Sequence, residues 1–306
     1  MAELRRPTCH ILLGLAGLSC NGSVVVSAPP GDAGASSVAP DAAAATGPRV
    51  LVSGLAAPLV LATDTSTLFF VSGDGRLSSI PLDGGDVRTL VTSDVAPIIA
   101  VDDVNVYVVL QQDGQLVAIP KDGGARARLS GPGRVSAVTT RAGAVFWAEA
   151  VDSTFILRSS RSATPLATFH GCCPGQLAAT KTTVFACAFA PLAAPIAGGS
   201  FTEFDGLRCQ WLRADDTAVF TESMNTLVQI DSDGRVSELF KGLGSTTAAL
   251  DSSGLYVAAS AKIQKVQSDG GAPIVVASEA VGVSSLALSE RGIFFAAMGT
   301  IRRVDK

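Results

Sequence analysis

Residues 101–124 read VDDVNVYVVLQQDGQLVAIPKDGG. Two mostly apolar runs, 104–110 and 116–120, are separated by a polar segment, and the second run is followed by Asp-Gly-Gly. Short runs rich in Val, Ile and Tyr that are bounded by Asp and Gly are typical of β-strands. Asp-Gly supplies the positive φ that a tight hairpin turn requires. The stretch therefore predicts two β-strands and a hairpin turn into a further strand.

The same unit recurs along the chain. An aromatic ring that follows an aliphatic or β-branched residue returns at intervals of 38, 39, 39, 35, 36 and 38 residues. The seven rings are Phe69, Tyr107, Phe146, Phe185, Phe220, Tyr256 and Phe294. In four units an aspartate that can cap the turn between the first two strands stands five residues before the ring. These aspartates are Asp64, Asp102, Asp215 and Asp251. Repeats of about 38 residues with four short strands indicate a β-propeller. We therefore predict an all-β fold, a seven-bladed β-propeller with four-stranded antiparallel blades.

Two details of the repeat lead to further expectations. The last unit ends after its third strand, and an additional strand at 49–53 precedes the first unit. We expect this N-terminal strand to complete blade seven and close the ring, which leaves no incomplete sheet. The units around Phe146 and Phe185 lack the Asp-Gly turn, so we expect those blades to be less regular.

The pattern of Asp, four residues, Tyr or Phe, and then Asp-Gly-Gly resembles the repeats of the YWTD, NHL and TolB-like group of propellers. It is especially similar to uncharacterised secreted lipoproteins of that type from high-GC bacteria. The resemblance covers residues 48–306 and implies the fold. These families include receptor ectodomains, envelope scaffolds and a few enzymes, so it implies no single function. Val108-Val109 follows Tyr107 in place of Trp-Thr-Asp, and no YWTD receptor role is carried over.

The N-terminal segment has the features of an export signal. Residues 1–20 contain two arginines, an apolar run at 11–18 that is too short to span a bilayer, and small residues before Cys20. Residues 17–20 resemble a bacterial lipobox, although Gly17 stands where leucine is preferred. We expect lipidation at Cys20; an ordinary cleaved signal and an uncleaved anchor are the alternatives.

Each of these alternatives predicts an extracytoplasmic protein. With a lipid on Cys20 it would be anchored to the bacterial outer membrane or cell surface, and without one it would be secreted. Residues 21–47 are rich in Ala, Ser, Gly and Pro and predict a disordered tether, and residues 48–306 form the propeller.

Four cysteines follow the signal segment and lie within one blade and its border. They are Cys172, Cys173, Cys187 and Cys209. Disulfides persist in exported proteins, so we predict two bonds, with Cys187 joined to Cys172 or Cys173 and Cys209 joined to the other. A thiolate metal site near His170 and a vicinal disulfide are the alternatives. The cysteine spacing matches no paired zinc knuckle, so we predict no metal site.

The chain offers few groups for catalysis. With 23 basic and 27 acidic residues and no basic stripe, it is not expected to bind nucleic acid. His170 is the single histidine after the signal, which excludes a multi-histidine metal centre. The sequence contains no phosphate-binding glycine loop and no G-x-S-x-G motif, and we predict no cofactor.

The remaining candidates are loop residues around the channel mouth. In a propeller the loops between the second and third strands and those between blades share one face. Five residues could gather there: Glu149, Asp152, His170, Arg208 and Glu222. The plainer interpretations are that His170 is an exposed loop residue without a role and that Glu222 lies at a strand end and reaches solvent.

We therefore predict a monomeric, non-catalytic binding or scaffold module that contacts a protein or glycan ligand at the cell envelope. The alternative is an envelope hydrolase or lyase that uses carboxylates at the channel mouth. Convergence of Glu149, Asp152 and Glu222 in one concave pocket would favour this alternative.

Overall fold

The computed structural model describes residues 47–131, 133–170, 174–259, 261–267, 271–278 and 282–306. The signal segment with Cys20, residues 21–46 of the expected tether, and Cys172 and Cys173 lie outside these residues. Within the described ranges the chain forms 28 strands, arranged in seven antiparallel four-stranded sheets. None of these ranges contains a helix long and apolar enough to cross a bilayer.

Each sheet is one blade. In six blades the strands follow in chain order from the innermost to the outermost, and in blade seven the N-terminal strand β1 is the outermost. Blade one contains β2 (Val60–Thr63), β3 (Thr67–Val71), β4 (Leu77–Pro81) and β5 (Arg88–Val91). Blade two contains β6 (Val95–Val101), β7 (Asn105–Leu110), β8 (Leu116–Pro120) and β9 (Ala127–Arg128). Blade three contains β10 (Arg134–Arg141), β11 (Ala144–Val151), β12 (Thr154–Ser159) and β13 (Ser162–His170). Blade four contains β14 (Gln176–Ala179), β15 (Thr183–Cys187), β16 (Pro191–Pro195) and β17 (Thr202–Glu203).

The remaining blades follow the same order. Blade five contains β18 (Leu212–Ala214), β19 (Ala218–Ser223), β20 (Thr226–Asp231) and β21 (Val236–Lys241). Blade six contains β22 (Ser245–Asp251), β23 (Gly254–Ala259), β24 (Lys262–Lys265) and β25 (Ile274–Ser278). Blade seven contains β26 (Val283–Ser289), β27 (Gly292–Ala297), β28 (Thr300–Val304) and β1 (Arg49–Val52).

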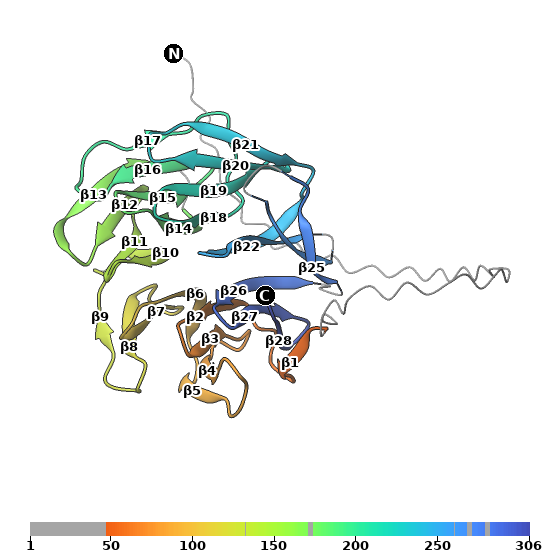
Figure 1. Ribbon diagram of the computed structural model, residues 1–306. Coiled ribbons are helices and arrows are strands. Elements are labelled where there is room, and N and C mark those ends of the chain that lie inside the picture. The colour runs from red at the N-terminus through yellow and green to blue at the C-terminus, as the bar shows by residue number, and fades with distance from the viewer. Residues whose placement is uncertain (1–46, 132, 171–173, 260, 268–270, 279–281) are drawn as a thin grey trace, which may run out of the picture. The chain divides into compact units, whose positions relative to one another are not determined.

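The innermost strands form a closed ring. Each contacts the innermost strand of the next blade, in the order β2, β6, β10, β14, β18, β22, β26 and back to β2 (Figure 1). The N-terminal strand β1 pairs antiparallel with β28, with Arg49 opposite Arg303 and Val50 opposite Arg302. The predicted seven-bladed propeller is confirmed, and its last blade combines strands from the two ends of the described chain.

The repeated aromatic rings lie in the second strand of each blade and pack between neighbouring sheets. Six of the seven are at most 5% exposed, and Phe220 is half-buried. Phe294 of blade seven packs with Leu68 of blade one, and Phe185 of blade four packs with Leu212 of blade five. Each such burial contributes about 1.5–3 kcal/mol to the free energy of unfolding. Because both faces of a blade are covered, its strands need few charged residues.

The aspartates cap their turns as predicted. Asp102 Oδ1 accepts hydrogen bonds from the backbone N–H groups of Val104 and Asn105, at 2.9 and 2.7 Å. The same arrangement holds the turn after Asp64 and the turn after Asp215. Asp251 Oδ1 likewise accepts from the backbone N–H of Ser253.

The two blades without Asp-Gly turns differ in regularity. Blade three forms strands of 6–9 residues, because Ser160 and Arg161 make a two-residue turn between β12 and β13. In strand length, blade three is therefore not the less regular blade that we expected. Blade four has an outermost strand, β17, of only two residues.

Candidate functional site

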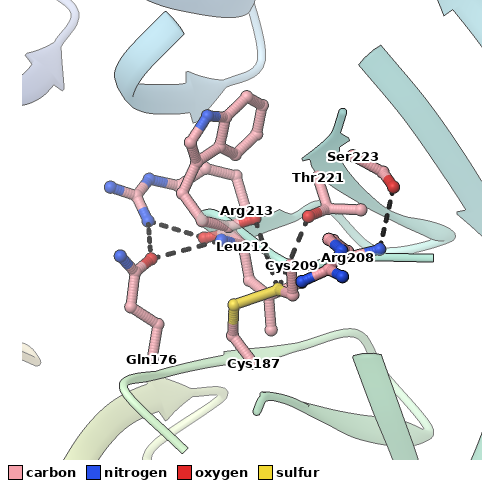
Figure 2. Close-up of a disulfide and its surroundings, with 9 residues drawn as sticks. Gln176, Cys187, Arg208, Cys209, Leu212, Arg213, Thr221 and Ser223 are labelled. Carbon is pink, nitrogen blue, oxygen red and sulfur yellow. Dashed lines mark hydrogen bonds between the residues drawn. A yellow bond between two sulfur atoms is a disulfide. The ribbon is translucent and has the colours of Figure 1, made fainter. Parts of the chain in front are cut away.

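A disulfide bond joins blade four to blade five. Cys187 is the last residue of β15, and Cys209 lies in the connection between β17 and β18 (Figure 2). Their Cα atoms are 5.5 Å apart, and their positions in the chain differ by 22. That both cysteines form disulfides is confirmed. The predicted pairing, with Cys187 bound to Cys172 or Cys173, is wrong.

The reason for this pairing is the direction in which Cys187 faces. In the hairpin of β14 and β15, Cys187 lies opposite Gln176, but its side chain belongs to the apolar core between blades four and five. Cys209 and Leu212 enter that core from the next blade. We predicted the partner of Cys187 from the residues opposite it in its own hairpin. The signal that could have corrected this prediction is the position of Cys209, three residues before the innermost strand of blade five.

Two exposed side chains flank this disulfide. Phe189 lies in the turn after β15 and is 63% exposed, and the guanidinium carbon of Arg208 lies 4.4 Å from the centroid of its ring. The backbone N–H of Cys209 donates to the carbonyl oxygen of Phe189 at 3.4 Å. The backbone N–H of Arg208 donates to Ser223 Oγ at 2.8 Å, as Figure 2 shows. The loops that carry Phe189 and Arg208 are thus tied to each other and to blade five.

A third exposed side chain follows Ser223. Met224 lies in the turn between β19 and β20, with φ at 48°, and is 64% exposed. We call Phe189, Arg208 and Met224 the blade 4–5 patch. All three come from loops between second and third strands or between blades, which share one face because the strands of each blade alternate in direction.

The residue types of this patch are those of protein interfaces. Aromatic residues, Met and Arg are enriched in the cores of interfaces, and buried aromatic and Arg side chains contribute most of the binding energy there. The disulfide and the loop hydrogen bonds restrain the two loops that carry Phe189 and Arg208. Restraint of this kind lowers the conformational entropy that any binding at such a surface would cost. Sequence reasoning selected Arg208 and missed Phe189 and Met224, because only the fold shows that those two apolar residues fall in turns.

Glu149 lies inside blade three. It is 1% exposed, its Oε2 forms an ion pair with Arg158 Nε at 2.7 Å, and its Oε1 accepts the backbone N–H of Gly133 at 3.0 Å. A substitution of Gly133 would bring a Cβ to 2.5 Å from the Glu149 side chain, so the loop fits closely over the carboxylate. Glu149 holds the connection between blades two and three.

Glu222 lies between blades five and six and is fully buried. Its Oε2 accepts hydrogen bonds from the backbone N–H of Ser245, at 2.9 Å, and from the hydroxyl group of the same residue. The indole N–H of Trp211 donates to that hydroxyl oxygen at 3.0 Å. The interpretation of Glu222 as a carboxylate that reaches solvent is wrong, because the first residue of β22 covers it.

The other two predicted site residues, Asp152 and His170, are exposed and belong to blade three. Asp152 stands in the turn between β11 and β12 with φ at 55°. His170 ends β13, and its Nδ1 lies 3.3 Å from Thr154 Oγ1. The structure describes no hydrogen bond or ion pair between any two of Glu149, Asp152, His170, Arg208 and Glu222, and none of the five lines the central cavity.

No family model and no curated protein matches the chain. Among solved structures, it is similar to the extracellular domain of a protein described as a hybrid two-component system from B. thetaiotaomicron, with a TM-score of 0.62 and 12% identity. That match covers 84% of this chain and 39% of the other, so this chain spans well under half of its length. It is also similar to the computationally designed protein Ika8, with a TM-score of 0.59 and 15% identity, over 84% of this chain and 98% of the other. At these identities the comparisons show the fold.

Proposed function

We propose that this protein is a monomeric, non-catalytic binding module that works outside the cytoplasm and holds a protein partner through the blade 4–5 patch. The observation that carries the proposal is the exposed Phe189–Arg208 pair beside the Cys187–Cys209 disulfide. A solvent-facing aromatic ring with a stacked guanidinium, fixed in place by a covalent bond, has no evident role in the packing of the blades.

A protein partner fits this patch better than a glycan does. Sugar rings bind to aromatic platforms through an open ring face, and the guanidinium group of Arg208 lies over the Phe189 ring. The exposed Met224 adds a flexible apolar side chain that adapts to irregular protein surfaces. The patch therefore resembles a protein-binding surface more than a sugar-binding one.

The location outside the cytoplasm rests on two observations. Residues 1–20 have the pattern of an export signal, and a disulfide is stable in an oxidising compartment. We further propose that Cys20 carries a lipid and that residues 21–47 tether the propeller to the membrane surface, as in the secreted lipoproteins that the repeat resembles. The extracellular location of the B. thetaiotaomicron domain is in keeping with this proposal.

The proposal of a non-catalytic role is supported by the positions of the carboxylates. Glu149 is engaged with Arg158 and Gly133, and Glu222 with Ser245, in separate contacts between blades. Turnover of a sugar, lactone or peptide substrate by the purified protein, abolished by Glu222→Gln, would contradict this part of the proposal.

The binding surface is tested with a photo-crosslinking amino acid placed at Met224 in the full-length protein. Val104 is the matched control position, because it is 65% exposed and lies in a turn between the first and second strands, on the opposite face. We expect Met224 to crosslink one envelope protein, and Phe189→Ala with Arg208→Ala to abolish that band. Equal crosslinking from Val104, or a band that survives the double substitution, would overturn the proposal, as would competition by envelope glycan instead of protein.

A further inference from the structure

A cavity of about 590 Å³ runs along the middle of the ring. It is lined by the innermost strands β2, β6, β10, β14, β18, β22 and β26. Cavities of this volume hold small organic molecules. Among the described residues that line it, the charged ones are Arg141 and Arg213, and none is an aspartate or glutamate. The wall is therefore suited to a ligand with negative charge.

Arg213 breaks the repeat at a defined position. The residue of the innermost strand that lies opposite the repeated aromatic ring is alanine or threonine in six blades. These residues are Ala62, Ala100, Thr139, Ala178, Ala249 and Ala287. In blade five the corresponding residue is Arg213, opposite Phe220. Because six blades form with a small side chain at this position, the fold alone does not require an arginine in blade five.

Within the part of the chain that the structure describes, Arg213 has neutral hydrogen-bond acceptors and no carboxylate as a counterion. Its Nε donates to the carbonyl oxygen of Ala248 at 2.5 Å, and its Nη1 donates to the carbonyl oxygen of Leu212 at 2.6 Å and to Gln176 Oε1 at 3.2 Å. All three acceptors are neutral. Arg141, by contrast, forms an ion pair with Asp216.

Arg213 is half-buried, and holding a cation partly out of water is unfavourable when no opposite charge lies nearby to repay the desolvation. Burial lowers the pKa of the Arg213 guanidinium to about 10. An anion bound in the cavity would supply the missing charge.

Two donors that have no acceptor among the described residues, Arg213 Nη2 and Gln176 Nε2, are suited to hold such an anion. No described residue accepts a hydrogen bond from Arg213 Nη2. Gln176 Oε1 accepts from the backbone N–H of Leu212 and from Arg213 Nη1, so the amide oxygen must point at these donors and the amide nitrogen away from them. Figure 2 shows the free nitrogen atoms of Arg213 and Gln176 pointing to the same side. Both residues line the cavity.

We infer that the central cavity is a binding site for a small molecule that carries a carboxylate or phosphate group, held by Arg213 Nη2 and Gln176 Nε2. A guanidinium and a primary amide that point to one side can each donate to an oxygen of the same oxyanion. This site is separate from the blade 4–5 patch, and the inference does not depend on the partner proposed there.

The test is isothermal titration calorimetry on the full-length protein with two probes, inorganic phosphate and succinate. The two arms distinguish a phosphate ligand from a carboxylate ligand. We expect one of them to bind with 1:1 stoichiometry. If neither binds at millimolar concentration, the inference is wrong.

Three variants locate the site. Arg213→Gln removes the charge, and we expect it to weaken binding about tenfold or more, the usual effect of losing a charged hydrogen-bond donor. Gln176→Glu places a carboxylate beside Arg213 Nη1, so the protein supplies its own counterion. Arg235→Gln is the matched control, because Arg235 is exposed on the same blade and does not line the cavity.

Gln176→Glu separates a binding role of Arg213 from a purely structural one. We expect this variant to raise the melting temperature and to abolish anion binding, since the new ion pair neutralises the site. Arg235→Gln should bind the probe as the wild type does. Undiminished binding by Gln176→Glu or Arg213→Gln, or an equal loss in Arg235→Gln, would overturn the inference.

Discussion

The carboxylate of Asp102 holds the turn between the first two strands of blade two. Its two oxygens accept the backbone N–H groups of the turn and the hydroxyl group of Tyr107, at 2.6 Å. Burial by itself raises the pKa of Asp102, but these hydrogen bonds lower it more, and its pKa lies below the usual value. The pKa values of Asp64, Asp215 and Asp251 are lowered in the same way, with burial opposing the hydrogen bonds.

We predict that Asp102→Ala lowers the free energy of unfolding by about 1–2 kcal/mol, because the turn and Tyr107 lose a charged acceptor. Urea denaturation at pH 7 measures this change. Asp103→Ala is the control, since Asp103 is exposed and lies next to Asp102 in the chain. Equal stability of the two variants would show that Asp102 does not hold the turn.

The same residue predicts a pH dependence. A carboxyl group whose pKa is lower in the folded state contributes stability above its unfolded pKa of about 3.9 and loses it as the pH falls through the folded value. We therefore expect the stability difference between wild type and Asp102→Ala to narrow between pH 5 and pH 2, as Asp102 becomes protonated. A difference that stays constant over this range would contradict the lowered pKa.

The burial of single carboxylates could not be predicted from the sequence. Glu222 stands near the end of a strand, where a side chain ordinarily reaches solvent, but Ser245 of the next blade covers it. The cover comes from a residue 23 positions further along the chain. A repeat pattern predicts the position of a residue within its blade. It carries little information about which residues of the neighbouring blade cover that position.

At the scale of elements, the Cys187–Cys209 disulfide links blades four and five, which also contact each other through packed side chains and through the hydrogen bonds of Gln176 Oε1 with Leu212 and Arg213. Phe185 and Leu212 lie in the same interblade core as the two cysteines. The bond closes a loop of moderate length that includes β16 and β17. By restricting the unfolded chain, a loop of this size stabilises the folded state by about 3 kcal/mol.

We predict that the double variant Cys187→Ala, Cys209→Ala loses about 3 kcal/mol of unfolding free energy. The measurement is urea denaturation under non-reducing conditions. Peptide mapping of the wild type should recover the two cysteines in one disulfide-linked pair. Recovery of Cys187 linked to Cys172 or Cys173 instead, or unchanged stability of the double variant, would contradict the structure.

The strands themselves were well predicted, because their signals are local. The signals are Asp-Gly turns, apolar runs between them and a recurring aromatic ring. Each can be recognised within about 40 residues, which is the length of one blade. The two-residue turn at Ser160 and Arg161 was missed because it uses neither Asp nor Gly. The exposure of Phe189 and Met224 could not be predicted, because the sequence around an apolar residue in a turn does not show that its side chain faces solvent.

At the scale of the whole molecule, the ring depends on the pairing of β1 with β28. Without β1, blade seven would keep three strands and expose the hydrogen-bonding edge of β28. This closure was predictable, because the chain lacks a fourth strand at its end and has an additional one before the first blade. The positive charge of the central cavity wall was not predictable, since the position of Arg213 in the wall depends on the register of β18 and β19.

We predict that deletion of residues 49–52 destabilises the entire propeller and promotes aggregation through the exposed edge. Thermal unfolding and size-exclusion chromatography measure the two effects. Deletion of residues 42–45, an Ala-Ala-Ala-Ala segment of the expected tether, is the control of equal length. If the two deletions have the same small effect, the ring does not depend on β1.

Binding of a protein partner through the blade 4–5 patch is the role that we propose for the whole molecule. The most direct test is the dissociation constant of the partner that Met224 crosslinks, measured for the wild type, Phe189→Ala and Val104→Ala. We predict that Phe189→Ala weakens binding about tenfold or more, as expected for an interface anchor, and that Val104→Ala leaves the affinity unchanged. Equal affinity of the wild type and Phe189→Ala would contradict this proposal.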